Sequence, residues 1–345
     1  MAKDLPLFDG VNDVDAYTAL RRFESHEVLA GDELLSQGKV AIGLFVVKSG
    51  LLEVRIGGVV VGTAGPGDLV GEMALFQDGA RTATVVAQED SEILVLDRAN
   101  YEALRDVVHP VAQKIEAHTI ALQVQRLRSV GERIATLAQG TLLDTPPPGA
   151  SFFEAIRSQF GPAGIFSSDP VDPLATMLKS PLFQDAAPQA LEQVADFFRE
   201  SAYGRGSLLC REGEIGNRMF LLDDGEVDVV IATAEGPRHI ASLVPGAAFG
   251  MVSMAQNGKR MSTCVAQTRV VVHELDLKGW RMLIEHPYGA GSAFRRAMIH
   301  AFGEQLSYAN TQLADFELSA ASIHRVEDLM NAAAGLEGYG AHLDR

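Results

Sequence analysis

Short runs of branched and aromatic residues, broken by glycines, recur along the chain and give its first structural expectation. In the first part of the sequence these runs are residues 44–47, 51–56, 59–61, 83–86 and 93–96. Runs of this length and composition, bounded by Gly and Pro-Gly pairs, predict short β-strands. Many short strands at close spacing are typical of a β-barrel or jelly roll. We therefore expect mainly β domains.

Helical periodicity follows the strands. Residues 111–138 contain no proline, and their apolar positions form a stripe at helical spacing: Ile120, Val124, Leu127, Ile134 and Leu137. This spacing predicts an amphipathic helix, and Pro110 suits its first turn. His286-Pro287 opens a corresponding helix, which we expect to end near Leu313.

The sequence also repeats itself. Gly31 and Gly38 each have a glycine 175 residues further along the chain, whereas Arg81 has its counterpart, Arg260, at 179 residues. One insertion of four residues explains the change of offset, and the polar stretch 233–237 is where a longer hairpin loop is expected. The chain therefore contains two copies of one domain.

These patterns divide the chain into four expected parts. They are a first domain at residues 1–140, a linker rich in proline and glycine at 141–174, a second domain at 175–315, and a C-terminal tail at 316–345. The expected fold class is mainly β with flanking helices (α+β), as two β-jelly-roll domains in tandem, each followed by a C-terminal helix.

Composition narrows the classes of function. The 345 residues carry a formal net charge of −16, which disfavours nucleic-acid binding because phosphate contacts need a basic face. No apolar run approaches the roughly 18–20 residues that cross a bilayer, and the first residues lack the apolar core of a signal peptide. Cys210 and Cys264 are too few for a disulfide framework. We expect a cytoplasmic protein without membrane insertion.

Signals for catalysis are missing as well. None of the nine histidines stands at metal-ligand spacing with a third ligand nearby. The sequence has no recognisable Ser/His/Asp or Cys/His set and no nucleotide-hydrolysing Gly-Lys-Ser/Thr loop. We therefore expect no catalytic residue, no metal and no cofactor.

Candidate binding chemistry lies between residues 71 and 85. A short helical turn after Gly71 would direct unpaired N–H groups toward an anion. Arg81 supplies a permanent guanidinium suited to two oxygens of one phosphate, and Glu72 can accept a hydrogen bond from a hydroxyl. Ala74 and Ala83 are small enough for close approach of the backbone to a ligand. These residues indicate a sugar-phosphate pocket, and the alternative is a surface Glu–Arg pair beside a strand.

The first copy resembles the phosphate-binding cassette of the cyclic-nucleotide-binding domain, with the residues Gly71, Glu72, Met73, Ala74 and Leu75, then Arg81, Thr82 and Ala83. That superfamily includes the bacterial catabolite activator protein and protein kinase A regulatory subunits, and the chain looks like a tandem member of the bacterial type. The resemblance implies that Arg81 binds the cyclic phosphate and Glu72 the ribose 2′-hydroxyl. It further implies that backbone amides near Ala74 and Ala83 complete the anion site and that the C-terminal helix closes over the base.

The second copy departs from this pattern. Its cassette reads Gly250, Met251, Val252, Ser253 and Met254, then Arg260, Met261 and Ser262. Arg260 keeps the phosphate partner, but the Met251 thioether cannot replace a carboxylate, and one lost charge-assisted hydrogen bond lowers affinity about 10- to 100-fold. We predict a degenerate second domain that serves as an interface or regulatory surface. Binding of another phosphate ligand, or weak cyclic-nucleotide binding, at this second site stays open.

The resemblance implies a cyclic-nucleotide sensor that signals to a protein effector by rearranging its helices and domains. The ligand would be cAMP or cGMP, which Thr82 and residues outside the cassette would distinguish. Alternatives are a cyclic dinucleotide receptor, or a scaffold whose two domains bind no ligand. A transcription factor is disfavoured because the residues after Leu313 are too few and too acidic for a helix-turn-helix. The helical stripes would either pair two chains in a homodimer or fold back on their own barrels.

Overall fold

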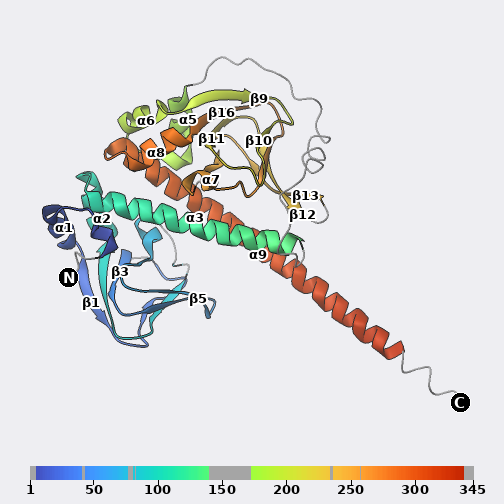
Figure 1. Ribbon diagram of the computed structural model, residues 1–345, viewed down its shortest axis with the longest axis horizontal. Helices are drawn as coiled ribbons and strands as arrows, with labels where there is room; N and C mark the ends of the chain where they lie inside the picture. The colour runs from blue at the N-terminus through green and yellow to red at the C-terminus, as the bar shows by residue number, and fades with distance from the viewer. Residues whose placement is uncertain are drawn as a thin grey trace. The chain divides into compact units, whose positions relative to one another are not determined.

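The computed structural model describes most of the chain, in the ranges 5–40, 43–76, 81, 83–139, 172–233, 236–256 and 258–337. Short strands and flanking helices follow one another in an order that occurs twice along these residues (Figure 1). The predicted linker, residues 141–174, lies almost wholly outside the described residues.

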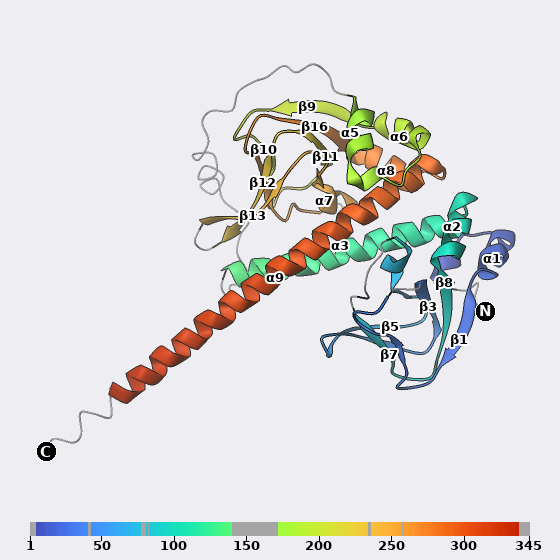
Figure 2. The same cartoon turned by 180° about the vertical axis from the view of Figure 1, so that it is seen from behind.

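Two four-stranded antiparallel sheets form the first barrel. The order in one sheet is β1-β8-β3-β6, with strands β1 (Glu24–Val28), β8 (Ser91–Asp97), β3 (Gly43–Ser49) and β6 (Leu69–Val70). The order in the other is β2-β7-β4-β5, with strands β2 (Glu33–Leu35), β7 (Thr84–Ala87), β4 (Leu52–Ile56) and β5 (Val59–Ala64). Figure 2 shows this barrel from behind. One buried cluster draws apolar residues from both sheets, among them Leu35, Phe45, Val47, Leu52, Val85 and Ile93.

The second barrel repeats this topology. One sheet has the order β14-β11-β16-β9, with strands β14 (Ala248–Phe249), β11 (Arg218–Asp224), β16 (Val270–Asp276) and β9 (Arg199–Tyr203). The other has the order β10-β15-β12-β13, with strands β10 (Leu208–Cys210), β15 (Thr263–Ala266), β12 (Val227–Thr233) and β13 (Gly236–Leu243). The prediction of two tandem jelly-roll domains within a mainly β fold is confirmed.

The four inserted residues have a different effect from the one expected. The sequence predicted a longer loop between the strands of the second hairpin, but the strands themselves are longer. β12 and β13 have seven and eight residues, whereas β4 and β5 have five and six. The paired register of β12 and β13 extends as far as Thr233 and Gly236, so the extra backbone groups are hydrogen-bonded in the ladder.

Helices flank both barrels. Before and within the first barrel they are η2 (Pro6–Phe8), α1 (Asp13–Leu20) and η3 (Glu72–Leu75), and after it α2 (Arg98–Asp106) and α3 (Pro110–Gln139). The second copy has α5 (Pro173–Lys179), η4 (Pro181–Phe183), α6 (Pro188–Ala195), α7 (Met251–Ala255), α8 (Leu277–Glu285) and α9 (Gly289–Glu337). The helix predicted at residues 111–138 is present, with Pro110 in its first turn.

The predicted end of the last helix was wrong. We expected it to end near Leu313, but α9 continues to Glu337. From residue 314 to 334 the sequence has neither proline nor glycine, so nothing there interrupts the helical hydrogen bonds. Residues 338–345 lie outside the described part of the chain.

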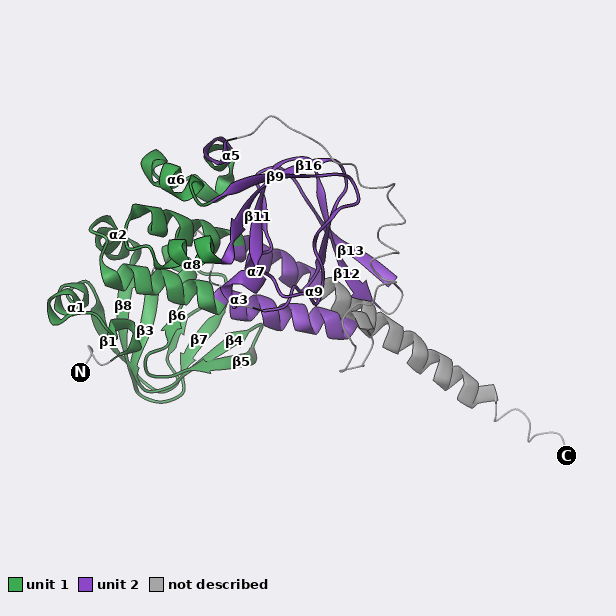
Figure 3. Cartoon of the chain, turned by 45° about the horizontal axis from the view of Figure 1, so that its top comes forward, with its two compact units in different colours: residues 1–122, 177–197, 278–301 green, residues 123–176, 198–277, 302–345 purple. Residues whose placement is uncertain are grey.

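The chain forms two compact units that do not follow its sequence halves (Figure 3). The first unit comprises residues 1–122, 177–197 and 278–301, and therefore holds the first barrel together with α6, α8 and the start of α9. The second comprises residues 123–176, 198–277 and 302–345. Each unit thus combines segments from both copies of the repeat.

The described residues hold neither a helix suited to a membrane span nor a cluster of side chains suited to a metal ion. No helix there is long and apolar enough to cross a membrane. The same residues contain no group of three or more His, Cys, Asp or Glu side chains placed to hold a metal ion.

Candidate functional site

The backbone of the first cassette turns at Gly71, immediately before η3. Gly71 has a φ of 74°, in the left-handed region that glycine adopts most readily. A Cβ atom at this position would lie 2.2 Å from Nη1 of Arg81. The backbone conformation therefore favours glycine, and any larger residue here would have to displace the Arg81 guanidinium.

Arg81 is held in place by the backbone around it. Its Nη1 donates to the Gly71 carbonyl at 2.9 Å, and its Nη2 donates to the Gly43 carbonyl, at the start of β3, at 2.8 Å. The guanidinium lies 5.4 Å from the centre of the Phe45 ring. Only 7% of Arg81 is exposed. Desolvation lowers the pKa of Arg81 and the nearby Glu72 raises it, so burial is the larger cause.

One donor of Arg81 has no acceptor. Its Nε is buried and makes no hydrogen bond within the described part of the chain. A buried donor on a charged group is costly when it is unpaired, about 1–3 kcal/mol or more. A phosphate oxygen would satisfy this donor and neutralise the charge. The first cassette therefore suits an anionic ligand.

The other predicted residues of the first site that the structure describes are buried or half-buried. Glu72 is 1% exposed and Ala74 is 6% exposed, both in η3, while Met73 and Ala83 are half-buried. The Ala74 N–H donates to the Gly71 carbonyl at 3.1 Å within the turn. Thr82 lies outside the described residues.

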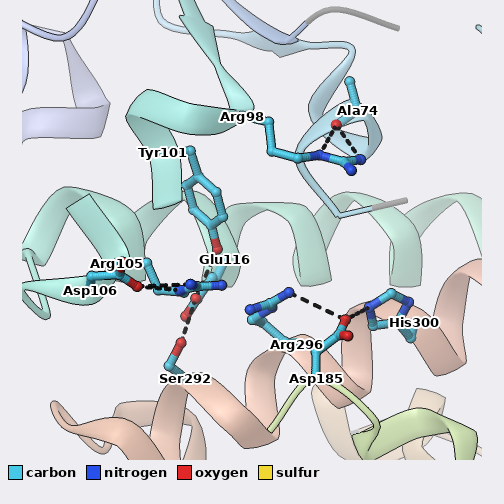
Figure 4. Close-up of polar contacts among 10 residues, drawn as sticks. All are labelled: Ala74, Arg98, Tyr101, Arg105, Asp106, Glu116, Asp185, Ser292, Arg296 and His300. Atoms are coloured by element: carbon cyan, nitrogen blue, oxygen red, sulfur yellow. Dashed lines mark hydrogen bonds and ion pairs between the residues drawn. The ribbon is translucent and has the colours of Figure 1, made fainter. Parts of the chain in front are cut away.

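A further residue, Arg98, was not singled out from the sequence. It is the first residue of α2, and its Nε and Nη2 donate to the Ala74 carbonyl at 3.2 and 2.9 Å (Figure 4). The rings of Phe76, just after η3, and Tyr101, in α2, pack edge to face with their centres 5.3 Å apart. These contacts connect the cassette to α2. No sequence motif predicts these contacts, because they join residues of separate elements.

The second cassette has a left-handed glycine at the corresponding place but a different polar arrangement. Gly250 has a φ of 79°, and Arg260 is 9% exposed. The Arg260 Nη1 donates to the Gly250 carbonyl and, at 2.8 Å, to the Ser253 hydroxyl, while Nη2 donates to the Arg218 carbonyl at 2.6 Å. Ser253 occupies the place of Ala74 in the first copy. The chain itself thus supplies Arg260 with a third acceptor.

Two methionines, Met251 and Met261, belong to the second site. Met251 is fully buried, and Nε2 of Gln305 in α9 lies 3.8 Å from its sulfur. Met261 and Ser262 are half-buried, and a Cβ at Gly131 in α3 would lie 3.1 Å from the Met261 sulfur. Segments of α3 and α9 that belong to the second unit therefore lie against this cassette.

Comparisons with known proteins agree on one type of domain. The family model described as Cyclic nucleotide-binding domain matches residues 25–106 and 200–286. A cAMP-dependent protein kinase regulatory subunit of Yarrowia lipolytica is 22% identical over 278 residues, which are 81% of this chain and 58% of that protein. A Cyclic AMP receptor protein of Thermus thermophilus is 36% identical over 131 residues, which are 36% of this chain and 59% of that protein. The chain thus spans less than two thirds of these relatives.

Among solved structures, the regulatory domain of Toxoplasma gondii PKA crystallised with cAMP is 19% identical. The match covers 83% of this chain and 90% of that one, with a TM-score of 0.32.

Proposed function

Because the chain carries two cyclic-nucleotide-binding domains in tandem, we propose that it is a sensor whose first domain binds a 3′,5′-cyclic nucleotide monophosphate. The observation that carries the proposal is the buried guanidinium of Arg81, which keeps an unpaired Nε donor beside the carboxylate-bearing turn at Glu72. The ligand we propose is cAMP or cGMP.

Each end of the sugar-phosphate has a suitable partner in the first cassette. The phosphate would bind Arg81, whose side chain is already fixed by two backbone carbonyls, so little conformational entropy is lost on binding. The ribose hydroxyl would donate to Glu72. Both contacts would form in a largely buried site, where charge-assisted hydrogen bonds are strong.

We propose that the second domain does not bind a cyclic nucleotide. Ser253 already donates to the Gly250 carbonyl and accepts from Arg260, and Met251 offers no acceptor for a ribose hydroxyl. A phosphate would have to compete with this internal hydroxyl. The expected stoichiometry is therefore one ligand per chain.

Output from the first site would begin at η3. Because Arg98 binds the Ala74 carbonyl and α2 leads directly into α3, a shift of η3 on binding would move both helices. Such a shift follows only if the ligand binds the two arrangements with different affinity. We propose that a protein effector reads this change, as a regulatory subunit's partner would.

Isothermal titration calorimetry of the full chain with cAMP, cGMP and a cyclic dinucleotide tests the proposal. We expect one monophosphate per chain, a loss of about 100-fold in affinity for Arg81→Ala and about 10-fold for Glu72→Gln, since each removes charge-assisted contacts. The matched control is Arg260→Ala, which should leave the affinity unchanged.

Circular dichroism and thermal unfolding of each variant separate a lost site from a lost fold. If neither monophosphate binds the wild-type protein more tightly than about 100 μM, a range corresponding to roughly 5–6 kcal/mol, the proposed function is wrong. If Arg260→Ala abolishes binding and Arg81→Ala does not, the competent site is in the second domain. Tight binding of the dinucleotide alone would instead support a cyclic dinucleotide receptor.

A further inference from the structure

A cavity of about 380 Å³ lies in the first unit, and no cassette residue lines it. Its walls come from α2 and α3, from the segment that leads from η4 into α6, and from the start of α9. Several of the lining residues are alanines, whose small side chains leave room for a ligand: Ala112, Ala186, Ala187, Ala190, Ala293 and Ala297. The volume falls in the range of small-molecule sites, roughly 300–1,000 Å³.

Two basic side chains of α9, Arg296 and His300, line this cavity and form long contacts with the same carboxylate, that of Asp185. Arg296 and His300 are one helical turn apart, and their nitrogens lie 3.5 and 3.8 Å from the same oxygen of Asp185 (Figure 4). A charge-assisted N–H···O bond normally measures about 2.7–2.9 Å. The side chain of Asp185 is 52% exposed, whereas those of Arg296 and His300 are 16% and 18% exposed. Asp185 is therefore a weakly held partner for two largely buried groups.

Neighbouring arginines keep unused donors. The Nε of Arg296 and the Nη2 of Arg295 are buried and have no hydrogen-bond partner among the described residues. The other nitrogens of Arg295 are engaged, Nε with Glu116 at 2.7 Å and Nη1 with the Ile284 carbonyl at 2.9 Å. Buried donors without acceptors are rare in folded proteins and point to a missing partner.

Acceptors in the same cavity are already engaged. Oε1 of Glu116 accepts from Tyr101 at 3.0 Å and from Ser292 at 2.8 Å, and its Oε2 accepts from Arg295. Asp106 accepts from Arg105 at 2.8 Å. The cavity therefore offers spare donors and few spare acceptors, which favours an anionic ligand over a cationic one.

We propose that this cavity binds a small organic oxyanion, a molecule with a carboxylate or phosphate group and a short apolar body. The oxyanion replaces Asp185 as the partner of Arg296 and His300, and the apolar body packs against the alanine walls. The planar fork of Arg296 suits two oxygens of one such group.

The cavity also shares α2 with the first cassette. Arg98 of α2 binds the Ala74 carbonyl of the cassette, and Tyr101 of the same helix binds Glu116 in the cavity wall (Figure 4). A ligand that shifts this wall changes the position of α2 and thereby the affinity for the cyclic nucleotide. Linkage makes the effect reciprocal, so each ligand changes the affinity of the other by the same factor.

The test uses the full chain without cyclic nucleotide, titrated by calorimetry with succinate, citrate and inorganic phosphate. We expect at least one probe to bind in the millimolar range or tighter, corresponding to about 4 kcal/mol. Arg296→Ala should weaken its binding about 10-fold or more, and Asp185→Ala should tighten it, because the internal competitor is removed. Arg281→Ala, at an exposed arginine of α8 outside the cavity, is the matched control.

Two results would overturn the proposal. One is the absence of binding by all three probes at millimolar concentration, and the other is binding that is unchanged by both Arg296→Ala and Asp185→Ala in folded protein. These titrations contain no cyclic nucleotide, so their result does not depend on whether the proposed function is correct. A second titration, of cAMP with the bound probe present, then measures the coupling factor.

Discussion

At the scale of single residues, Gln37 in the first copy and Glu212 in the second each accept a hydrogen bond from a backbone N–H at corresponding places. In the first barrel, Oε1 of Gln37 accepts from the Gly57 N–H at 2.9 Å. In the second, Oε2 of Glu212 accepts from the Ala232 N–H at 3.0 Å. Burial raises the pKa of Glu212 to about 7, although the bond from Ala232 lowers it. Gln37 is exposed, whereas Glu212 is half-buried, so the two side chains differ in burial as well as in charge.

Glu212 gives the second barrel a dependence on pH. Its pKa is about 7 when folded against an ordinary value of 4.5, so the folded protein holds this proton more tightly than the unfolded chain. The resulting stability is present in full below pH 4.5 and is lost as the pH rises to about 7. Glu212→Gln should therefore have a higher Tm than the wild type at pH 8 and nearly the same Tm at pH 4, as measured by thermal unfolding across that range.

The first copy supplies the control for this experiment. Gln37→Glu introduces the same carboxylate at an exposed position, where desolvation is small, and should leave the pH dependence of Tm unchanged. Parallel Tm curves for the wild type and Glu212→Gln would show that Glu212 is not the group responsible.

At the scale of elements, a buried ion pair joins α3 to α9 within the first unit. Glu116 and Arg295 are each 1% exposed, and the same carboxylate accepts from Tyr101 of α2 and Ser292 of α9. Burial, followed by the charge of Glu116, raises the pKa of Tyr101 well above its usual value, so the phenol remains a donor. The Glu116 carboxylate therefore links three helices, α2, α3 and α9.

Removing one member of this pair should be more harmful than removing both. Glu116→Gln leaves the Arg295 charge buried without its partner, which costs about 3–5 kcal/mol, whereas Glu116→Leu with Arg295→Met leaves no buried charge. We expect the urea midpoint of the first variant to fall well below that of the double variant. A double variant as unstable as Glu116→Gln would show that the charge is not the dominant part of the interaction.

Sequence patterns predicted the elements better than their assembly. The repeat and the strands follow from local composition, and the stripe on α3 was predicted correctly in that Ile120, Val124 and Leu127 are all buried. The role of Ser253 was not foreseen, because its hydroxyl matters only once Gly250 brings it to Arg260. The role of Arg98 was not predicted either, because it depends on the contact with the Ala74 carbonyl. Contacts between elements distant in sequence leave no periodic signal in a single chain.

At the scale of the whole molecule, the first unit depends on residues from both halves of the sequence. Val111 and Ile115 of α3 are fully buried there, as are Phe294 and Met298 of α9. Gln113 of α3 also donates to the Pro287 carbonyl at 2.6 Å. A fragment that ends in the predicted linker would leave Glu116 without Arg295 and Gln113 without the Pro287 carbonyl.

Separate expression of residues 1–140 and 172–345 tests this interdependence. We expect the first fragment alone to unfold at a lower temperature than the full chain, because each large apolar side chain exposed costs about 1.5–3 kcal/mol. Mixed or co-expressed, the fragments should elute together as a one-to-one complex in size-exclusion chromatography, with the Tm largely restored. Arg295→Ala in the second fragment should weaken that association, since it removes the partner of Glu116. Two fragments that are stable alone and do not associate would show that each copy of the repeat folds as an independent domain, so that a signal from the first cassette would have to reach an effector without passing through α9.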